Sequence, residues 1–475
     1  MTSTTRSRSP SAGLVVAAHP AAADAGAGAL AAGGSAVDAA VATAFALCVV
    51  DPANCGVGGY GGFLTYAPPA GAPVAVDFNT WVPERLDPRD FRLPGETSEF
   101  VDGGPSVAPP AVVAGLLAAH ERFGRLPLAE VAGPAIRVAA DGFTVGGDLA
   151  RALVEHWERT GGGEPRFASI FYPQGRPPEA GSILAQPDLA GTLETIAARG
   201  AAAFSAGPIV EAVCEAVQAD AGFLTSADFR TAVAVAPAGS VAFESAVVSG
   251  PSRETSGAGV LFAALEGVAP ERLGANRDAA YVAEISRALG AAWQERTDAA
   301  RAALQARHTS SFCTADADGG LVALTFTHGS LLFGSGLVAP GTGVVLNAGA
   351  NLFATTTGGP LAVTNMCPVV LEQDDGTRHA LGGTGGPRIP GILLTAVVDV
   401  VHYESTLGAA FAAPHLSVRP LAGTLEAEPE LLEVAGGGQP LGSGDFGPAS
   451  GITRTADELL PAIDPRFDSG VAFAS

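Results

Sequence analysis

Apolar positions in the first part of the chain form one short run and two segments of helical length. Residues 14–16 are an apolar run typical of a buried strand, and residues 21–30 are rich in alanine, which favours a helix. Gly33 and Gly34 would end that helix, and Ser35 would cap the next one, at residues 36–50. This second segment is apolar on nearly all sides, so we expect it inside the protein.

Helical patterns continue through the middle of the chain, and strand patterns follow. The residues between 161 and 187 are rich in Gly and Pro and predict a long surface loop. Frequent β-branched and aromatic residues at 235–248 and 309–346 predict two groups of strands, the second in a central sheet. These groups, with helices between them, predict an α/β protein whose sheets stack between helical layers. Further helices are expected at 112–123, 128–141, 150–160, 189–199, 207–221 and 277–301.

Composition excludes several classes of function. The formal charge of −22 repels nucleic acid and anionic membranes, and the 26 basic residues are all arginine, which excludes Schiff-base chemistry on lysine. The five cysteines show no CxxC spacing and the eight histidines no HxxxH spacing, so we expect neither a metal nor another cofactor. Without a secretion signal or an apolar run of about 18 residues, the chain is expected to be cytoplasmic, with a small molecule as substrate.

A cluster of hydroxyl side chains stands two thirds of the way along the chain. Thr309, Ser310 and Ser311 precede a turn sequence that begins at Asp316. Taken alone, this stretch also fits a strand that runs into a hairpin. The run of glycines from Gly56 to Gly62 allows close approach of backbone or ligand, but a strand pattern follows it, which argues against a phosphate loop.

Many short motifs resemble those of γ-glutamyltransferases, in the same order. The resemblance extends from about residue 14 to 472. Arg388, which follows the glycine turn, could pair with a substrate acid or form a structural salt bridge. The motifs that carry it include Gly33-Gly34-Ser35-Ala36-Val37-Asp38, Asp51-Pro52, Gly56-Val57-Gly58-Gly59-Tyr60-Gly61-Gly62-Phe63, Gly334-Ser335-Gly336, Gly382-Gly383-Thr384-Gly385-Gly386-Pro387-Arg388 and Asp464-Pro465-Arg466.

The resemblance implies an N-terminal-nucleophile hydrolase with a four-layer αββα sandwich. Such proteins cut themselves before a threonine seven residues ahead of the turn aspartate, which here is Thr309, so the cut would fall after His308. A large subunit, 1–308, and a small subunit, 309–475, would then form one interlocked heterodimer. Its new terminal amine would serve as general base for the Thr309 hydroxyl. By resemblance, Thr327 would support the nucleophile, and the amides of Gly385 and Gly386 would form the oxyanion hole.

The chain departs from the family where the substrate amino acid is bound. An arginine that holds the α-carboxylate is replaced by Asn79, and an acid that holds the α-amino group is replaced by Leu352. Paired serines match Thr364 and Asn365, and a family asparagine matches Ser330 across a one-residue insertion. Loss of both charged partners disfavours glutathione as substrate, because a charge-assisted hydrogen bond contributes about 1.5–3 kcal/mol.

Three functions are consistent with these residues. The preferred one is an autoprocessed enzyme that forms an acyl-Thr309 ester and passes the acyl group to water or an amine, with altered acyl recognition. The second is a hydrolase of carbon-carbon bonds that removes an oxalyl-type group in actinobacterial alkylproline antibiotic biosynthesis, a form of secondary metabolism. The third is an inactive, unprocessed homologue that acts as a binding protein.

Overall fold

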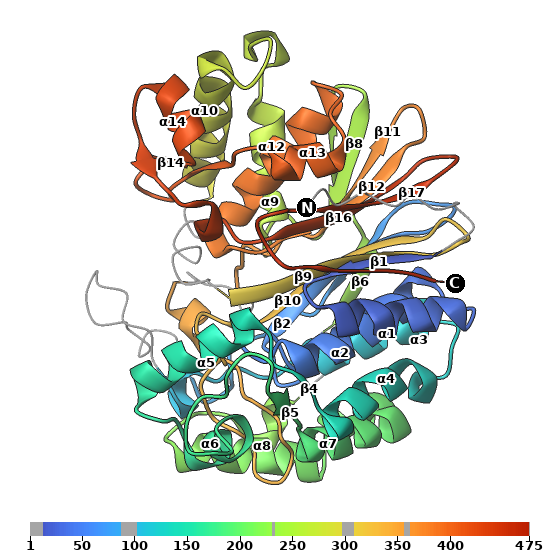
Figure 1. Ribbon diagram of the computed structural model, residues 1–475, viewed down its shortest axis with the longest axis vertical. Helices are drawn as coiled ribbons and strands as arrows, with labels where there is room; N and C mark the ends of the chain where they lie inside the picture. The colour runs from blue at the N-terminus through green and yellow to red at the C-terminus, as the bar shows by residue number, and fades with distance from the viewer. Residues whose placement is uncertain (1–12, 87–101, 230–232, 297–307, 356–361, 475) are drawn as a thin grey trace.

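Two stacked β-sheets form the centre of the molecule in the computed structural model, which describes residues 13–86, 102–229, 233–296, 308–355 and 362–474. Figure 1 shows the sheets lying between two groups of helices. The larger sheet has the strand order β18 (Gly470–Phe473), β1 (Leu14–Ala17), β9 (His308–Ala315), β10 (Leu321–Gly329), β2 (Gly61–Ala67), β3 (Val74–Asp77) and β6 (Ala234–Pro237). The smaller has the order β17 (Leu459–Ile463), β16 (Ala449–Arg454), β12 (Arg378–Gly383), β11 (Val369–Gln373), β8 (Ala246–Gly250) and β7 (Gly239–Phe243).

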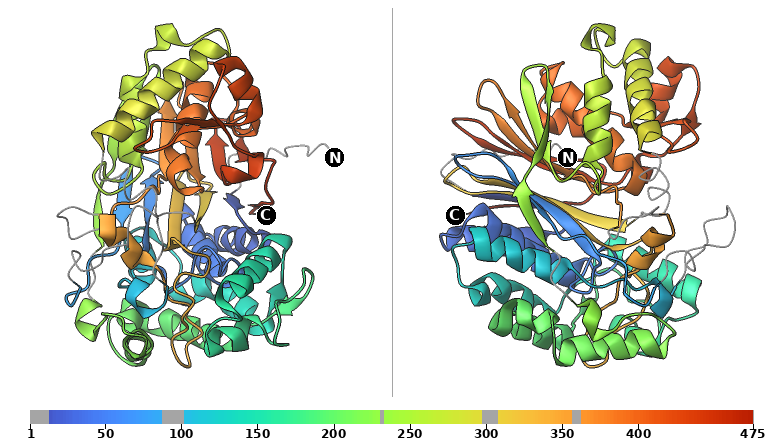
Figure 2. Two further views of the ribbon diagram at one scale, coloured as in Figure 1. Left: turned by 90° about the vertical axis from the view of Figure 1, so that its left-hand side faces the viewer. Right: turned by 180° about the vertical axis from the view of Figure 1, so that it is seen from behind.

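Helices cover the outer face of each sheet, so the expected four-layer αββα sandwich is confirmed. Seen from behind in Figure 2, the chain crosses from one sheet to the other between β6 and β7. On the side of the larger sheet, α1 (Pro20–Ala31), α2 (Ala36–Val50) and α3 (Val112–Phe123) pack against its strands. Beyond them on the same side lie α4 (Leu128–Asp141), α5 (Gly147–Thr160), α6 (Pro165–Phe171), α7 (Pro187–Arg199) and α8 (Pro208–Ala219). On the side of the smaller sheet, α9 (Ala258–Gly267), α12 (Ile389–Val401) and α13 (Leu407–Ala412) pack against its strands, and α10 (Ala279–Glu295) and α14 (Pro429–Ala435) lie beyond them.

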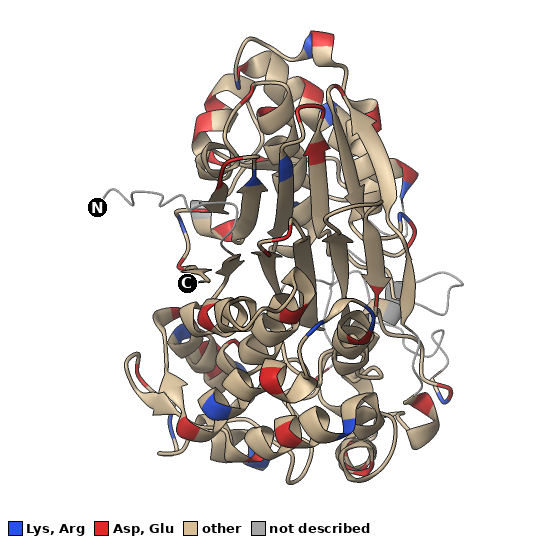
Figure 3. Ribbon diagram, turned by 90° about the vertical axis from the view of Figure 1, so that its right-hand side faces the viewer, with Lys and Arg blue, Asp and Glu red and all other residues tan. Residues whose placement is uncertain are grey.

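Each layer boundary is apolar. One cluster of buried side chains lies between the larger sheet and its helices, and another between the smaller sheet and its helices. A third lies between the sheets and includes Leu14, Cys313, Leu321, Val370 and Ile452. Figure 3 shows the charged residues mainly on helices and at the ends of strands. Strands buried on both faces explain why the sequence shows continuous apolar runs there instead of alternation.

The helix α2 is fully buried and packs against β9 and β10 of the larger sheet. All 15 of its residues are buried, as its apolar sequence predicts. Ser35 caps it through a reciprocal box in which Asp38 N donates to Ser35 Oγ at 3.2 Å and Ser35 N donates to Asp38 Oδ2 at 2.7 Å. The helix ends at Val50, so that Asp51 and the glycine-rich turn that follows lead into β2.

Some expected elements differ from the structure. The predicted surface loop at 161–187 contains α6, which Glu164 caps by accepting from Phe167 N at 3.0 Å, and the two-residue strand β5 (Ile183–Leu184), which pairs with β4 (Phe143–Thr144). The Gly- and Pro-rich composition of this segment gave no indication that Glu164 would cap a helix. A minor third sheet, β13 (Leu416–Val418), β14 (Leu425–Ala427) and β15 (Gln439–Pro440), lies outside the two main ones.

The predicted strand group at 309–346 stops earlier than expected. Regular strands end at Gly329, and two isolated bridges follow, Val338 with Val345 and Gly329 with Ala348. Glycines at 334, 336, 341 and 343 adopt positive φ values, which break a strand. The helix expected at 277–301 begins at Ala279, with Asp278 as its cap, and its last predicted residues, 297–301, lie outside the described ranges.

Among the described helices, no single one is long and apolar enough to cross a membrane. Residues 187–204 and 208–219 pass that test only as a pair, and they are bent by 70° relative to each other.

Candidate active site

Thr309 lies at the beginning of β9, between β1 and β10 in the larger sheet. The expectation of a strand that runs into a hairpin is met, because β9 pairs with β10 through the turn after Asp316. Thr309 is only 7% exposed. It lines two cavities at once, a large one of about 920 Å³ and a small one of about 10 Å³. Its side chain is therefore placed where two separate parts of a substrate could meet.

A β-bulge places Thr327 against the predicted cleavage point. The β9–β10 register is regular from Leu321 to Phe326, which pairs with Ser310, but His308 then pairs with Gly329, one residue further than regular pairing allows. At this bulge, Thr327 Oγ1 donates to the carbonyl oxygen of His308 and accepts from Gly329 N at 2.8 Å. The carbonyl of the bond that would be cut therefore already receives a hydroxyl hydrogen bond.

The glycine turn after β12 reaches Thr309 from the smaller sheet. Gly385 lines the large cavity and Gly386 the small one, so the turn borders both cavities that Thr309 lines. Both glycines have positive φ, 108° and 62°. A Cβ atom on Gly385 would lie 2.0 Å from the carbonyl oxygen of Phe446, so only glycine fits there without displacement of the backbone.

The small cavity brings together three of the predicted substrate-binding residues. Leu352, Thr364 and Asn365 line it, and each is at most 1% exposed. Both polar atoms of the Asn365 side chain are buried without a hydrogen-bond partner among the described residues. A buried amide without partners costs free energy, which a ligand with matching groups would recover. Apart from His308, every residue that lines this cavity is uncharged.

The other two predicted substrate contacts lie behind the cavity wall. Asn79 is 1% exposed, and its side-chain amide donates to the carbonyl oxygen of Ala362, two residues before Thr364. Ser330 is also 1% exposed, and its hydroxyl donates to Ala348 O at 3.5 Å. The structure does not place either side chain in the lining of the two cavities. Asn79 instead fixes the segment that carries the small-cavity residues.

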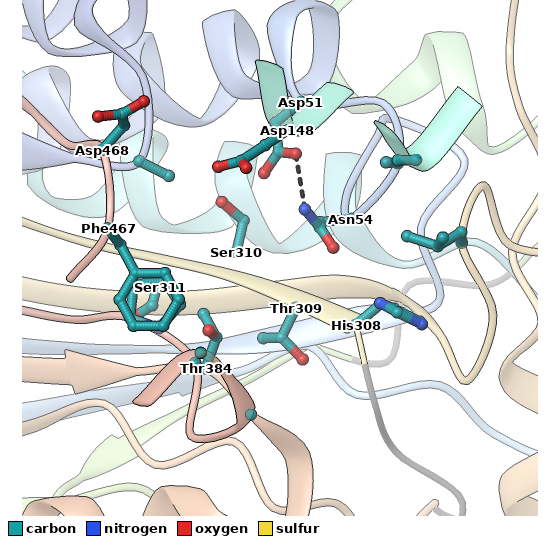
Figure 4. A pocket seen from close by; sticks show the side chains of 18 of the residues that line it. Asp51, Asn54, Asp148, His308, Thr309, Ser310, Ser311, Thr384, Phe467 and Asp468 are labelled. Carbon is teal, nitrogen blue, oxygen red and sulfur yellow. Dashed lines mark hydrogen bonds between the residues drawn. The ribbon is translucent and has the colours of Figure 1, made fainter. Parts of the chain in front are cut away.

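The large cavity contains residues that sequence reasoning did not single out. Figure 4 shows Asp51 and Asn54 across the cavity from Thr309 and Thr384, with Ser310 below Asp51. Asn54 Nδ2 donates to Asp51 Oδ1 at 2.8 Å. Burial raises the pKa of Asp51 to about 7, despite the opposing hydrogen bond from Asn54. In the sequence, Asp51 could have been singled out only by its position, directly after an apolar helix and before the glycine-rich turn.

Metal binding finds no support in the described part of the chain. There, no group of three or more His, Cys, Asp or Glu side chains is arranged to hold a metal ion.

Comparison of the sequence with protein families gives a result that is consistent with the site and the two-sheet fold. The γ-glutamyltranspeptidase family model matches residues 22–299 and 269–474. The chain belongs to this family. Its relatives include the glutathione hydrolase proenzyme of Escherichia coli, 28% identical over 96% of this chain and 90% of that protein. The acylase ACY 1 proenzyme of Pseudomonas sp. strain SE83 is 30% identical over 90% of this chain and 85% of that protein.

Solved structures match the γ-glutamyltranspeptidase-family chain over its whole length. Cephalosporin acylase from Bacillus halodurans superposes with a TM-score of 0.84 at 23% identity, covering 99% of this chain and 97% of that one. LmbA2991HD superposes with a TM-score of 0.84 at 19% identity, covering 99% and 100%. These likenesses establish the shared fold. The family itself is shown by the family model and the sequence relatives, which are a hydrolase and an acylase.

Proposed function

We propose that the protein is a self-cleaving acyl-transfer enzyme whose nucleophile is Thr309. The bond between His308 and Thr309 breaks, and residues 1–308 and 309–475 stay together as a heterodimer. The observation that carries this proposal is the position of Thr309 in the linings of two cavities, which Thr327 and the Gly385–Gly386 turn also line.

Self-cleavage requires attack by the Thr309 hydroxyl on the carbonyl carbon of His308. The C–N bond breaks as a C–O ester bond forms, the amine of Thr309 takes the proton, and water then hydrolyses the ester. The hydrogen bond from Thr327 to the His308 oxygen supports this step, because negative charge develops on that oxygen. Two of the relatives named above are also described as proenzymes.

Turnover would use the same atoms with a substrate in place of His308. The freed amine has an unperturbed pKa near 8, so it is available as a base for the hydroxyl close to neutral pH. The backbone N–H groups of Gly385 and Gly386 would stabilise the oxyanion as the acyl-Thr309 ester forms. Water or an amine then releases the acyl group.

The acyl group is proposed to occupy the small cavity. Leu352 offers no charge to an α-amino group, and the buried Asn365 amide offers one donor and one acceptor side to a neutral polar group. An acyl part that is not a free amino acid fits this lining better than a γ-glutamyl group. The cavity, about 10 Å³, has room for about one water molecule, so an acyl group enters only as the lining side chains adjust.

Hydrolysis of a carbon-carbon bond is the second candidate function. The small cavity favours a short leaving fragment such as an oxalyl-type group. The uncharged lining gives an oxalyl carboxylate no counter-charge, which is why acyl transfer from an amide is preferred. A third possibility, a binding protein without activity, is disfavoured because Thr309, Thr327 and the glycine turn are all retained in one place.

A denaturing gel with intact-mass measurement tests the cleavage. We expect two fragments that end at His308 and begin at Thr309. Thr309→Ala should stay in one piece, whereas Thr309→Ser, which keeps a hydroxyl nucleophile, should still be cut. Wild-type protein that persists as a single chain on incubation would refute self-cleavage.

Matched p-nitroanilides then test the acyl preference of the processed protein. A γ-glutamyl anilide, a butyryl anilide and an α-keto acid with a cleavable carbon-carbon bond should be compared at equal concentrations. We expect the butyryl anilide to be the best of the three. Faster turnover of the γ-glutamyl anilide would refute the proposed effect of Leu352 on acyl recognition, and faster turnover of the α-keto acid would favour the second candidate.

A further inference from the structure

The large cavity and the small one share His308 and Thr309 in their linings. If the small cavity holds the acyl group, the large cavity holds the part of the substrate that leaves, or the amine that accepts the acyl group. Its volume of about 920 Å³ is within the range of sites for drug-sized molecules. The chemistry of its lining therefore indicates the chemistry of that second part.

Acidic side chains dominate this lining among the described residues. Six carboxylates line the cavity against three arginines. Two of the arginines are already paired with carboxylates of the lining, at 2.6 Å in one case and 3.3 Å in the other. The lining therefore has an excess of negative charge at neutral pH, even though Asp51, whose pKa burial raises to about 7, is then only about half ionised. The six carboxylates belong to Asp51, Asp148, Glu155, Glu426, Asp445 and Asp468.

Asp51 is the carboxylate best placed to act on a ligand near Thr309. Figure 4 shows it opposite Thr309, with the carboxylate of Asp148 beside it. Asn54 holds one of its oxygens at 2.8 Å, which fixes the orientation of the group. The residue is partly buried, so a charge placed beside it would be screened less than on the open surface.

One further side chain points to a ligand in this cavity. The hydroxyl oxygen of Ser450 is buried without a hydrogen-bond partner among the described residues, and the residue is 7% exposed. It lines the large cavity. Ser310 lines the cavity too and lies near Asp51 in Figure 4, where its hydroxyl opposes the rise in the pKa of that carboxyl. An unpaired hydroxyl in a cavity lined by carboxylates is a partner that the polar atoms beside an ammonium group would need.

We propose that the large cavity binds a substrate part or acceptor that carries a protonated amine, with Asp51 as its principal counter-charge. This inference rests on the proposed function in one respect: the small cavity is taken to hold the acyl group, and the large cavity the other part of the substrate or the acceptor. Asp468 adds negative potential around the same space. Anionic leaving groups and acceptors are disfavoured by the same charges.

Binding of three small probes tests the inference without need of turnover. The probes are 4-fluorobenzylamine, 4-fluorobenzyl alcohol and 4-fluorobenzoate, which differ in charge but not in ring, and their binding is followed by fluorine NMR. The protein is used both as prepared and as the Thr309→Ala variant. The variants Asp51→Asn and Asp141→Asn remove the same charge, the first inside the cavity and the second from the exposed end of α4.

We expect the amine to bind about tenfold more tightly than the alcohol, and the benzoate to bind least. Asp51→Asn should remove most of that advantage, whereas Asp141→Asn should leave it unchanged. Equal binding of amine and alcohol, or equal loss in both variants, would overturn the inference. Because probe binding is measured separately from cleavage, acyl transfer without amine preference would refute this inference alone, and amine preference without acyl transfer would refute the proposed function alone.

Discussion

Removal of the Thr327 hydroxyl should slow self-cleavage while leaving the fold in place. The side chain is 2% exposed, and its oxygen links the His308 carbonyl to Gly329 N across the β-bulge. Thr327→Val preserves shape and β-branching but removes both hydrogen bonds. The substitution therefore isolates the polar contribution of one atom.

The size of the effect follows from these two contacts. Loss of one donor to a developing oxyanion costs about 2.7–4 kcal/mol in other enzymes, or about 10²–10³ in rate. Loss of the acceptor for the buried Gly329 amide costs about 1–3 kcal/mol of stability. That second cost falls on the precursor and on the transition state alike, so it lowers stability with little effect on the rate. We expect cleavage to slow by about 100-fold.

The assay follows the single chain and its two fragments over time on a denaturing gel, beginning from freshly made precursor. Thr325→Val is the matched control, because Thr325 lies two residues earlier on the same strand and is also fully buried. Its hydroxyl bonds with Ser311 Oγ at 3.0 Å, away from the cleaved bond. This control should lose stability to a similar extent but cleave at the wild-type rate.

Two outcomes would refute the reasoning. If Thr327→Val cleaves as fast as the wild type, the hydrogen bond to the His308 carbonyl does not assist the reaction. If both threonine variants slow cleavage equally, the effect comes from disturbed strand packing. A thermal melt of both precursors separates these cases from general misfolding.

Three further predictions concern activity and stability. Gly385→Ala should abolish activity, because its Cβ would lie 2.0 Å from Phe446 O, whereas Gly383→Ala, whose Cβ meets nothing nearer than 3.8 Å, should retain most of it in the same anilide assay. Asp51 has a folded pKa raised to about 7, so its contribution to stability should fall as pH rises from about 4 to 7, and urea titrations of Asp51→Asn should lack up to about 1.4 kcal/mol per pH unit of that downward slope relative to the wild type. Arg466→Met should lower the free energy of unfolding by about 3–5 kcal/mol, because it removes the arginine counter-charge from two buried carboxylates, those of Glu428 and Asp464; an unchanged urea midpoint would contradict this.

Much of the fold could be predicted from the sequence. The all-apolar segment of α2, its Ser35 cap and the order of glycine motifs predicted a buried helix and a layered sandwich, and the structure confirms both. Local patterns suffice here because burial on both faces forces long apolar runs, and because glycine is required wherever backbones approach closely. The same local reading failed at 161–187, where a glutamate cap and aromatic packing outweigh the loop-like composition.

Only the tertiary structure decided how the candidate site is divided. The sequence placed Asn79, Ser330, Leu352, Thr364 and Asn365 in one group of substrate contacts, but the fold puts the first two behind the wall and the last three in the small cavity. The pattern of residues determined which elements form and which hydroxyls and glycines they carry. The bulge opposite Thr309, the unpaired Asn365 amide and the position of Asp51 depend on contacts between segments that lie far apart in the chain, so they follow from packing and not from local sequence.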